Sequence, residues 1–181
     1  MRRVYIVLIL LSFIFSSCIS IKNPFSIRSS MEIKEGYLSL KSINKNLEKQ
    51  MPLIARMGDN EVKIVSVTAF ASDDGSSLIV EIEFIFTSFE IPEGLPGVAR
   101  VRSLITYNPQ TKEFRFAQIS NPEIKFLKES LLEYVSPNQR KFISRAIVSK
   151  LYTLILHKSK RELTPIKSFS VKEGKIKILF R

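Results

Sequence analysis

The chain has 181 residues, of which 28 are Lys or Arg and 17 are Asp or Glu, so its formal net charge is +11. Its single cysteine and single histidine exclude a disulfide framework within the chain and a metal site built from several His and Cys ligands. The basic residues are spread along the chain, which favours a solvated surface over a dedicated binding patch.

The N-terminal segment, residues 1–17, is predicted to be a lipoprotein signal peptide. Two arginines precede an apolar run over residues 4–15, and this run is shorter than the roughly 20 residues of a comfortable membrane-spanning helix. The stretch Phe15-Ser16-Ser17-Cys18 resembles a bacterial lipobox, in which the chain is cut before the cysteine and the cysteine is acylated. An uncleaved N-terminal anchor, or a signal sequence that merely contains a buried cysteine, are the alternatives.

Cys18 is the predicted lipidation site. A lone cysteine in an exported chain has no disulfide partner within that chain, and acylation accounts for its presence. Several acyl chains anchor a protein stably, because each buried methylene contributes about 0.8 kcal/mol. Residues 18–30 then form a lipidated tether. Ile19 stands where lipoproteins kept in the inner membrane have Asp, so the expected location is the cell envelope, at the outer membrane facing the periplasm in a Gram-negative cell. The expected partners include the membrane and exclude nucleic acid.

The remaining residues, 31–181, are enough for one domain with a sizeable core. A strand is expected from Met31, followed by a short helix that carries Ile43, Leu47 and Met51 on one face and ends near Pro52. Apolar residues then alternate with polar ones in four segments that predict strands: 61–72, 77–89, 98–107 and 114–120.

Charged residues on two of these strands predict their pairing. Glu81 and Glu83 share one face of the strand 77–89, and Arg100 and Arg102 share one face of the strand 98–107. If the strands are neighbours, these arginines can pair with the glutamates on the solvent side. A loop rich in proline and glycine is expected to join the two strands at residues 90–97.

The clearest helix start in the chain is Ser136, followed by Pro137 in the first turn and Gln139 at the capping-box position. Apolar residues between Phe142 and Leu156 cover nearly the whole circumference of the helix, so it is expected to be enclosed by a sheet. A last hairpin is expected with its turn at residues 173–174. The predicted fold is therefore α+β, with a curved antiparallel β-sheet wrapped around one long C-terminal helix.

This arrangement resembles the YceB-like lipoproteins, a bacterial family of unknown function, over about residues 31–181. The features that carry the resemblance are the first strand and helix, "LITYNPQTKEFRF" at 104–116, the apolar helix 138–156 and "FSVKEGKIKILF" at 169–180. The resemblance implies an acylated N-terminus and a sheet curled around one long helix, a shape similar to half of a tubular lipid-binding domain. It implies no catalytic residues.

The inventory of reactive side chains predicts no catalytic site, no metal site and no cofactor. His157 lies near the expected end of the long helix, where its charged form suits the helix dipole. Asp73 and Asp74 are interpreted as turn residues rather than a cation site. Glu81 and Glu83 could form an acid–base pair, but the arginines expected opposite them offer a simpler account.

The apolar inner faces suggest one function, the binding of a hydrophobic ligand such as an acyl chain or phospholipid between the sheet and the long helix. The residues expected to line this site are Phe84, Phe86, Ile105, Phe116, Ala146, Ile147 and Leu151. Dense packing of the same side chains is the alternative. With a solid core, the protein is instead expected to be a non-catalytic envelope scaffold that meets a protein partner through its basic exterior or the loop 90–97. An enzyme is the third alternative.

Overall fold

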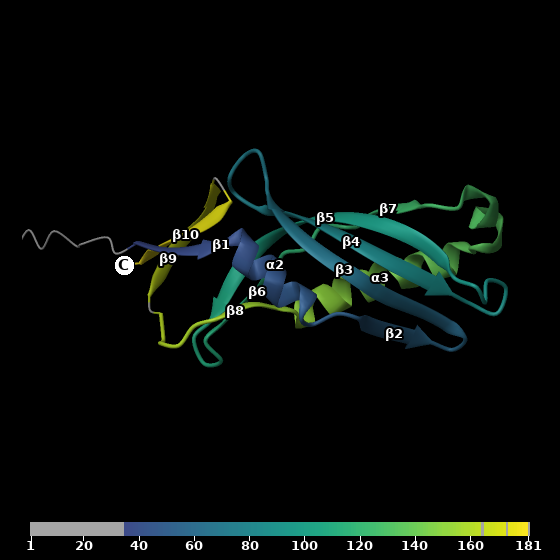
Figure 1. The fold of residues 1–181 in the computed structure, drawn as a ribbon, viewed down its shortest axis with the longest axis horizontal. Coiled ribbons are helices and arrows are strands. Elements are labelled where there is room, and N and C mark those ends of the chain that lie inside the picture. Colours follow the sequence, from purple (N-terminus) through teal and green to yellow (C-terminus); the bar gives the residue numbers. More distant parts are fainter. Residues whose placement is uncertain (1–34, 164, 173, 181) are drawn as a thin grey trace, which may run out of the picture. The chain divides into compact units, whose positions relative to one another are not determined.

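The computed structural model describes residues 35–163, 165–172 and 174–180 (Figure 1). The predicted signal peptide, the tether and the lipidation site Cys18 lie outside the described residues. The chain divides into Met1–Glu32 and one compact unit, Ile33–Arg181, to which all of the following applies.

The compact unit consists of ten strands, two α-helices and one 3₁₀ helix within its described residues. In chain order they are β1 (Glu35–Ser39), α2 (Leu40–Glu48), β2 (Leu53–Met57), β3 (Asn60–Ala71), β4 (Leu78–Thr87), β5 (Leu95–Asn108), β6 (Glu113–Ala117), β7 (Glu123–Phe126), η1 (Glu129–Tyr134), α3 (Pro137–Thr153), β8 (Ile155–Lys158), β9 (Ile166–Lys172) and β10 (Lys175–Phe180).

The predicted fold class is wrong, because the protein is mostly β, with 50% of its described residues in strands and 22% in helices. The predicted long C-terminal helix is the shorter helix α3, and three strands follow it. The physical reason lies at Leu154, whose backbone is extended (φ −73°, ψ 139°), so the helix stops there. The following residues pair with β6 as β8. A short apolar run fits a buried strand as well as a helical turn, and here the pairing with β6 decides.

The larger sheet is antiparallel and curled into a half-barrel, with the strand order β2-β3-β4-β5-β6-β8. The short strand β7 pairs with the first half of β5, on the same side as β6 pairs with the second half. Helix α3 runs along this sheet (Figure 1) and contacts β2, β3 and β6. It buries Ile143, Ala146, Ile147 and Leu151. The helix is therefore the inner layer of a β-rich core.

The predicted pairing of β4 with β5 is confirmed, and one of its two ion-pair predictions is confirmed with it. Arg100 lies opposite Glu81, and the distance from its Nη2 to Glu81 Oε1 is 2.9 Å. Arg102 lies opposite Ile79 rather than Glu83, and it pairs with Asp74 at 2.9 Å. The register thus places the second arginine beside the β3–β4 turn.

The loop predicted at residues 90–97 is shorter than expected, because β5 already begins at Leu95. Gly97 pairs with Phe84, and a Cβ atom at this position would overlap the aromatic ring of Phe84. This close approach explains why a glycine occupies the interior of a buried strand.

The smaller sheet has three strands in the order β1-β10-β9. Its hairpin β9–β10 confirms the predicted last hairpin, and Gly174 in the turn has a positive φ of 72°. Besides the pairing of β10 with β1, two further backbone hydrogen bonds join this hairpin to other described residues. Leu40 N donates to Gly174 O at 2.9 Å, and Val171 N donates to Gly75 O at 2.7 Å. The start of α2 is thereby fixed between the two sheets.

Candidate functional site: the groove between α2 and β3

The residues predicted to line a ligand site are all in the core. They are brought together there, with exposed fractions of 1% for Phe84, 0% for Phe86, 9% for Ile105, 2% for Phe116, 6% for Ala146, 0% for Ile147 and 0% for Leu151. Neither of two surface pockets along the described residues has any of these side chains in its walls. A ligand between the sheet and α3 therefore stays a prediction.

The larger pocket is a groove between α2 and β3 with a volume of about 1150 Å³. We call it the α2–β3 groove. Its walls are Leu40, Lys41, Asn44, Lys45 and Glu48 from α2, residues 65–71 of β3, and Met51 and Gly174. A smaller pocket of about 290 Å³ lies between the end of β5 and the start of β9. Consecutive strand residues line the larger groove, so it follows the edge of β3 rather than one of its faces.

This edge of β3 is open because β2 is short. β2 pairs with β3 only from Asn60 to Ile64, whereas β4 on the other side pairs with β3 as far as Ala71. A register shift between Ile64 and Ser66 makes Val65 the extra residue of a bulge. Residues 65–71 of β3 consequently have a strand neighbour on one side only.

Asn44 of α2 occupies one position of this open edge. Its Nδ2 donates to Ala69 O at 3.0 Å, and Ala69 N donates to its Oδ1 at 2.9 Å. A neighbouring antiparallel strand would make the same two bonds. The N–H and C=O of one strand residue point to the same side and alternate along the strand, so Val67 and Ala71 direct theirs into the groove. Among the described residues, no hydrogen-bond partner is found for the Val67 backbone on this side.

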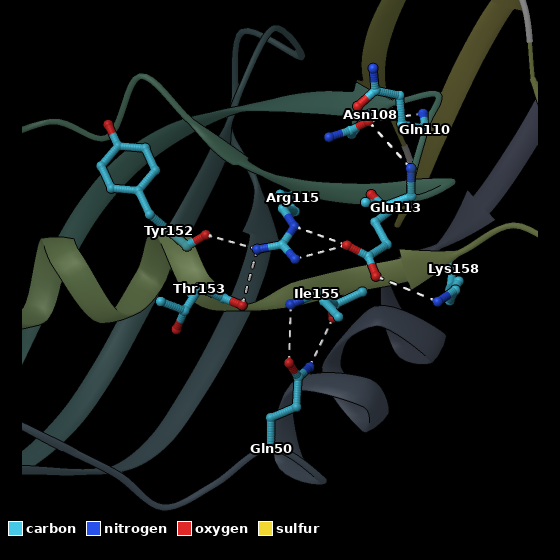
Figure 2. Close-up of polar contacts among 10 residues, drawn as sticks. Gln50, Asn108, Gln110, Glu113, Arg115, Tyr152, Thr153, Ile155 and Lys158 are labelled. Atoms are coloured by element: carbon cyan, nitrogen blue, oxygen red, sulfur yellow. Dashed lines mark hydrogen bonds and ion pairs between the residues drawn. The ribbon is translucent and has the colours of Figure 1, made fainter.

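The opposite edge of the curled sheet, at β8, is covered in a similar way. Gln50 Nε2 donates to Ile155 O at 2.8 Å, and Ile155 N donates to Gln50 Oε1 at 3.0 Å (Figure 2). Asn46 Nδ2 also donates to Leu156 O at 3.2 Å. Side-chain amides on and just after α2 thus substitute for a strand at both edges. They cover β8 and leave most of the β3 edge open.

Two lysines give the groove a basic rim. Lys41 and Lys45 are four residues apart on α2, so they lie on one face of the helix, and both are exposed. Glu48 is the one carboxylate in the walls of this groove. The walls also carry apolar side chains, among them Phe70 with 43% of its surface exposed. The groove therefore combines basic, apolar and backbone hydrogen-bonding groups.

A cluster of charged residues near the end of α3 is structural (Figure 2). The Glu113 carboxylate accepts hydrogen bonds from Arg115 Nη2 at 2.8 Å and Nε at 3.2 Å, and Lys158 Nζ lies 3.6 Å from it. Arg115 Nη1 donates to the carbonyl oxygens of Tyr152 and Thr153 at 3.4 Å each. The hydrogen bond from Arg115 lowers the pKa of the Glu113 carboxyl and keeps it charged. The cluster ties the C-terminal end of α3 to β6.

Other polar residues considered in the sequence also have structural partners. Asp74 accepts hydrogen bonds from Ser72 Oγ at 2.5 Å and from Ser76 N at 3.0 Å, as a turn residue does. These bonds lower the pKa of Asp74. Within the described ranges, no three His, Cys, Asp or Glu side chains gather in a way that could hold a metal ion.

His157 is not at the end of a helix as predicted but in strand β8. Its ring lies 6.0 Å from that of Phe114, and burial lowers its pKa below the ordinary value of 6.5. The unfolded chain therefore binds a proton at His157 more readily than the folded chain, and this residue should destabilise the fold as the pH falls through and below 6.5.

Replacing His157 by Gln should therefore reduce the fall of the urea midpoint with falling pH. A variant with an unchanged pH profile between pH 7 and 5.5 would contradict this assignment (window set by the His pKa of about 6.5).

The sequence did not reveal the groove. Ile43 and Leu47 share a buried face of α2 as predicted, whereas Met51 lies beyond the end of this helix at Glu48. Asn44, between the first two, gives no sign in the sequence of its partner Ala69. Asn44 and its partner Ala69 are 25 positions apart in the chain.

None of the helices in the described part of the chain is long and apolar enough to cross a membrane. The chain matches no protein-family model, and no curated protein matches it either.

Proposed function

We propose that the protein is a lipid-anchored, non-catalytic envelope protein that recognises a protein partner through the α2–β3 groove. The observation that carries this proposal is the open edge of β3 at residues 65–71. The anchored part of the proposal rests on the lipobox-like stretch before Cys18 and on the resemblance to the YceB-like lipoproteins. The lipid anchor and the membership of this family are therefore proposals.

An open strand edge is a binding surface that proteins usually cover, because its unpaired N–H and C=O groups can pair with another chain. Here the edge lies inside a groove whose other wall is a helix. Grooves of this kind bind extended peptides, in which backbone hydrogen bonds give affinity and side-chain contacts give specificity. The low exposure of the side chains beside α3 supports the same conclusion, since it fits a core packed around the helix.

A hydrophobic ligand such as an acyl chain or phospholipid is the second candidate function. It is favoured by the apolar part of the groove, formed by Leu40, Met51, Val65 and Phe70. The volume of about 1150 Å³ is slightly larger than that of common ligand sites, which measure roughly 300–1,000 Å³. Lys41 and Lys45 would then face an anionic headgroup.

The groove function can be tested by photocrosslinking in cells that produce the full chain. A benzophenone-bearing phenylalanine at Phe70 places the reactive group in the groove, and the same residue at Phe89, which is 85% exposed outside it, is the matched control. A protein adduct of one mass from position 70 and not from 89 supports the proposal. Adducts of lipid mass support the second candidate, and equal crosslinking from both positions contradicts both.

The anchor is tested separately with Cys18→Ser. We expect the full chain to incorporate radiolabelled palmitate and to sediment with membranes. The variant should lose the label, because the only cysteine of the chain is gone. A full chain that takes up no label and still sediments with membranes would favour an uncleaved apolar anchor.

A further inference from the structure

We propose that the partner enters the α2–β3 groove as an extended, acidic segment that adds to β3 as a further strand beside residues 65–71. This inference rests on the proposed function and names the kind of partner. The segment would lie in line with β2, beyond the point where Leu53 opposite Ile64 begins the existing pairing.

The backbone of β3 is the first argument for a strand. Residues 65–71 extend over roughly 20 Å, which is enough for a segment of about four to seven residues. Val67 and Ala71 direct their N–H and C=O groups toward the groove, as the bonds of Ala69 to Asn44 establish. An acyl chain cannot satisfy these groups, whereas the backbone of an extended peptide can.

Asn44 is the second argument, because its side chain already imitates the missing strand. It holds the central donor and acceptor of the edge, at Ala69. An added strand would take over both bonds, which requires the Asn44 side chain and the adjoining part of α2 to move away from the β3 edge, because neighbouring strands lie only about 4.8 Å apart. The Asn44 side chain therefore competes with the partner for the backbone groups of Ala69, and removing this side chain should strengthen partner binding.

Charge selects the sequence of the segment. Side chains of an added strand point alternately to its two faces, so every second one would face the same wall of the groove. Lys41 and Lys45 outnumber Glu48 in the walls of the groove and favour carboxylates, while Phe70 favours apolar residues. A second copy of this edge would bring its own two lysines to the same rim. Like charges make such self-pairing unfavourable, as lysines on exposed edges commonly do.

The test uses the full chain in detergent micelles and a displayed library of random peptides of about nine residues. We expect the enriched peptides to alternate acidic and apolar residues. The best of these is synthesised in two forms, one unmodified and one N-methylated at every second residue to remove the backbone donors that face β3. N-methylation in that register should weaken binding by about tenfold or more, and methylation in the other register should not.

Three variants of the protein complete the test. Asn44→Ala should bind the peptide roughly three- to tenfold more tightly, because the competing amide is gone. The double variant Lys41→Glu/Lys45→Glu should bind about tenfold or more weakly. Val67→Pro should also lose binding, since it removes the groove-facing N–H without removing a bond to β4. Proline at this position also restricts the backbone. If Val67→Pro fails to fold for this reason, the double variant of the exposed lysines provides the test instead.

Three results would overturn the inference. The first is enrichment of basic peptides, and the second is equal binding of the two N-methylated forms. The third is a combined result, in which palmitate displaces all enriched peptides from the groove and Asn44→Ala binds the peptides with unchanged affinity. If position 70 still crosslinks to a protein in cells, the proposed function stands and only the extended strand is wrong. If position 70 crosslinks to nothing, the proposed function is wrong as well.

Discussion

Replacing Phe114 by alanine is expected to lower the free energy of unfolding by about 3–5 kcal/mol, the largest loss for any single truncation considered. Phe114 is fully buried, with 0% of its surface exposed. Its ring lies 4.8 Å from that of Tyr107 in β5, and 6.1 Å from that of Phe169 in β9, which belongs to the smaller sheet. This side chain therefore joins the two sheets.

Urea denaturation followed by circular dichroism measures the effect. Phe70→Ala is the matched control, because it removes the same number of atoms from a side chain that is 43% exposed, and it should cost far less. If Phe114→Ala lost no more stability than Phe70→Ala, the two sheets would not share a core at this residue.

Replacing Ala146 by phenylalanine is the second large effect. Ala146 is on the inner side of α3 and is 6% exposed among buried neighbours. A ring inserted there must force side chains or backbone apart, so we expect a loss of about 1–3 kcal/mol or more. A ligand cavity beside α3 would instead accommodate the ring with little loss.

Ser149→Phe controls for the effect of a phenylalanine on the exposed side of the same helix. The expected result is a lower urea midpoint for Ala146→Phe and a nearly unchanged midpoint for Ser149→Phe. Equal midpoints in the two variants would show room beside α3. The hydrophobic site predicted from the sequence would then regain support over the groove.

Local signals in the sequence predicted several elements correctly. Ser136 and Gln139 form the expected capping box, with Ser136 N donating to Gln139 Oε1 at 2.8 Å and Gln139 N donating to Ser136 Oγ at 3.3 Å. The four predicted middle strands correspond to β3, β4, β5 and β6. Strict alternation and a cap are properties of a few neighbouring residues, which is why they can be read without the fold.

Elements that depend on distant partners were missed. The apolar pattern predicts a last helical turn over Leu154–Leu156, but Leu154 is the C-cap of α3, and pairing with β6 makes Ile155 and Leu156 the start of an additional strand. β2 and β7 are short and partly polar, with sequences LIARM and EIKF, so neither has a clear alternation of its own. The balance of helix and strand, and with it the fold class, depended on these segments.

The candidate site was less predictable than the fold. Apolar residue types on inner faces are the same in a packed core and in a cavity, so Phe84 and Ile147 could not be assigned to either. The groove exists because β2 ends while β3 continues, and because Asn44 fills one position of the edge. Both features depend on tertiary structure, and no local sequence pattern predicts them.

Amide hydrogen exchange at Val67, measured by NMR on the protein without peptide, tests the open edge most directly. The Val67 amide should exchange about tenfold or more faster than the Thr68 amide, which points toward β4, although the two are adjacent in the same strand. A bound peptide should slow the exchange of Val67 selectively. Equal protection of Val67 and Thr68 in the free protein would mean that this edge is already paired and is not a binding surface for a further strand.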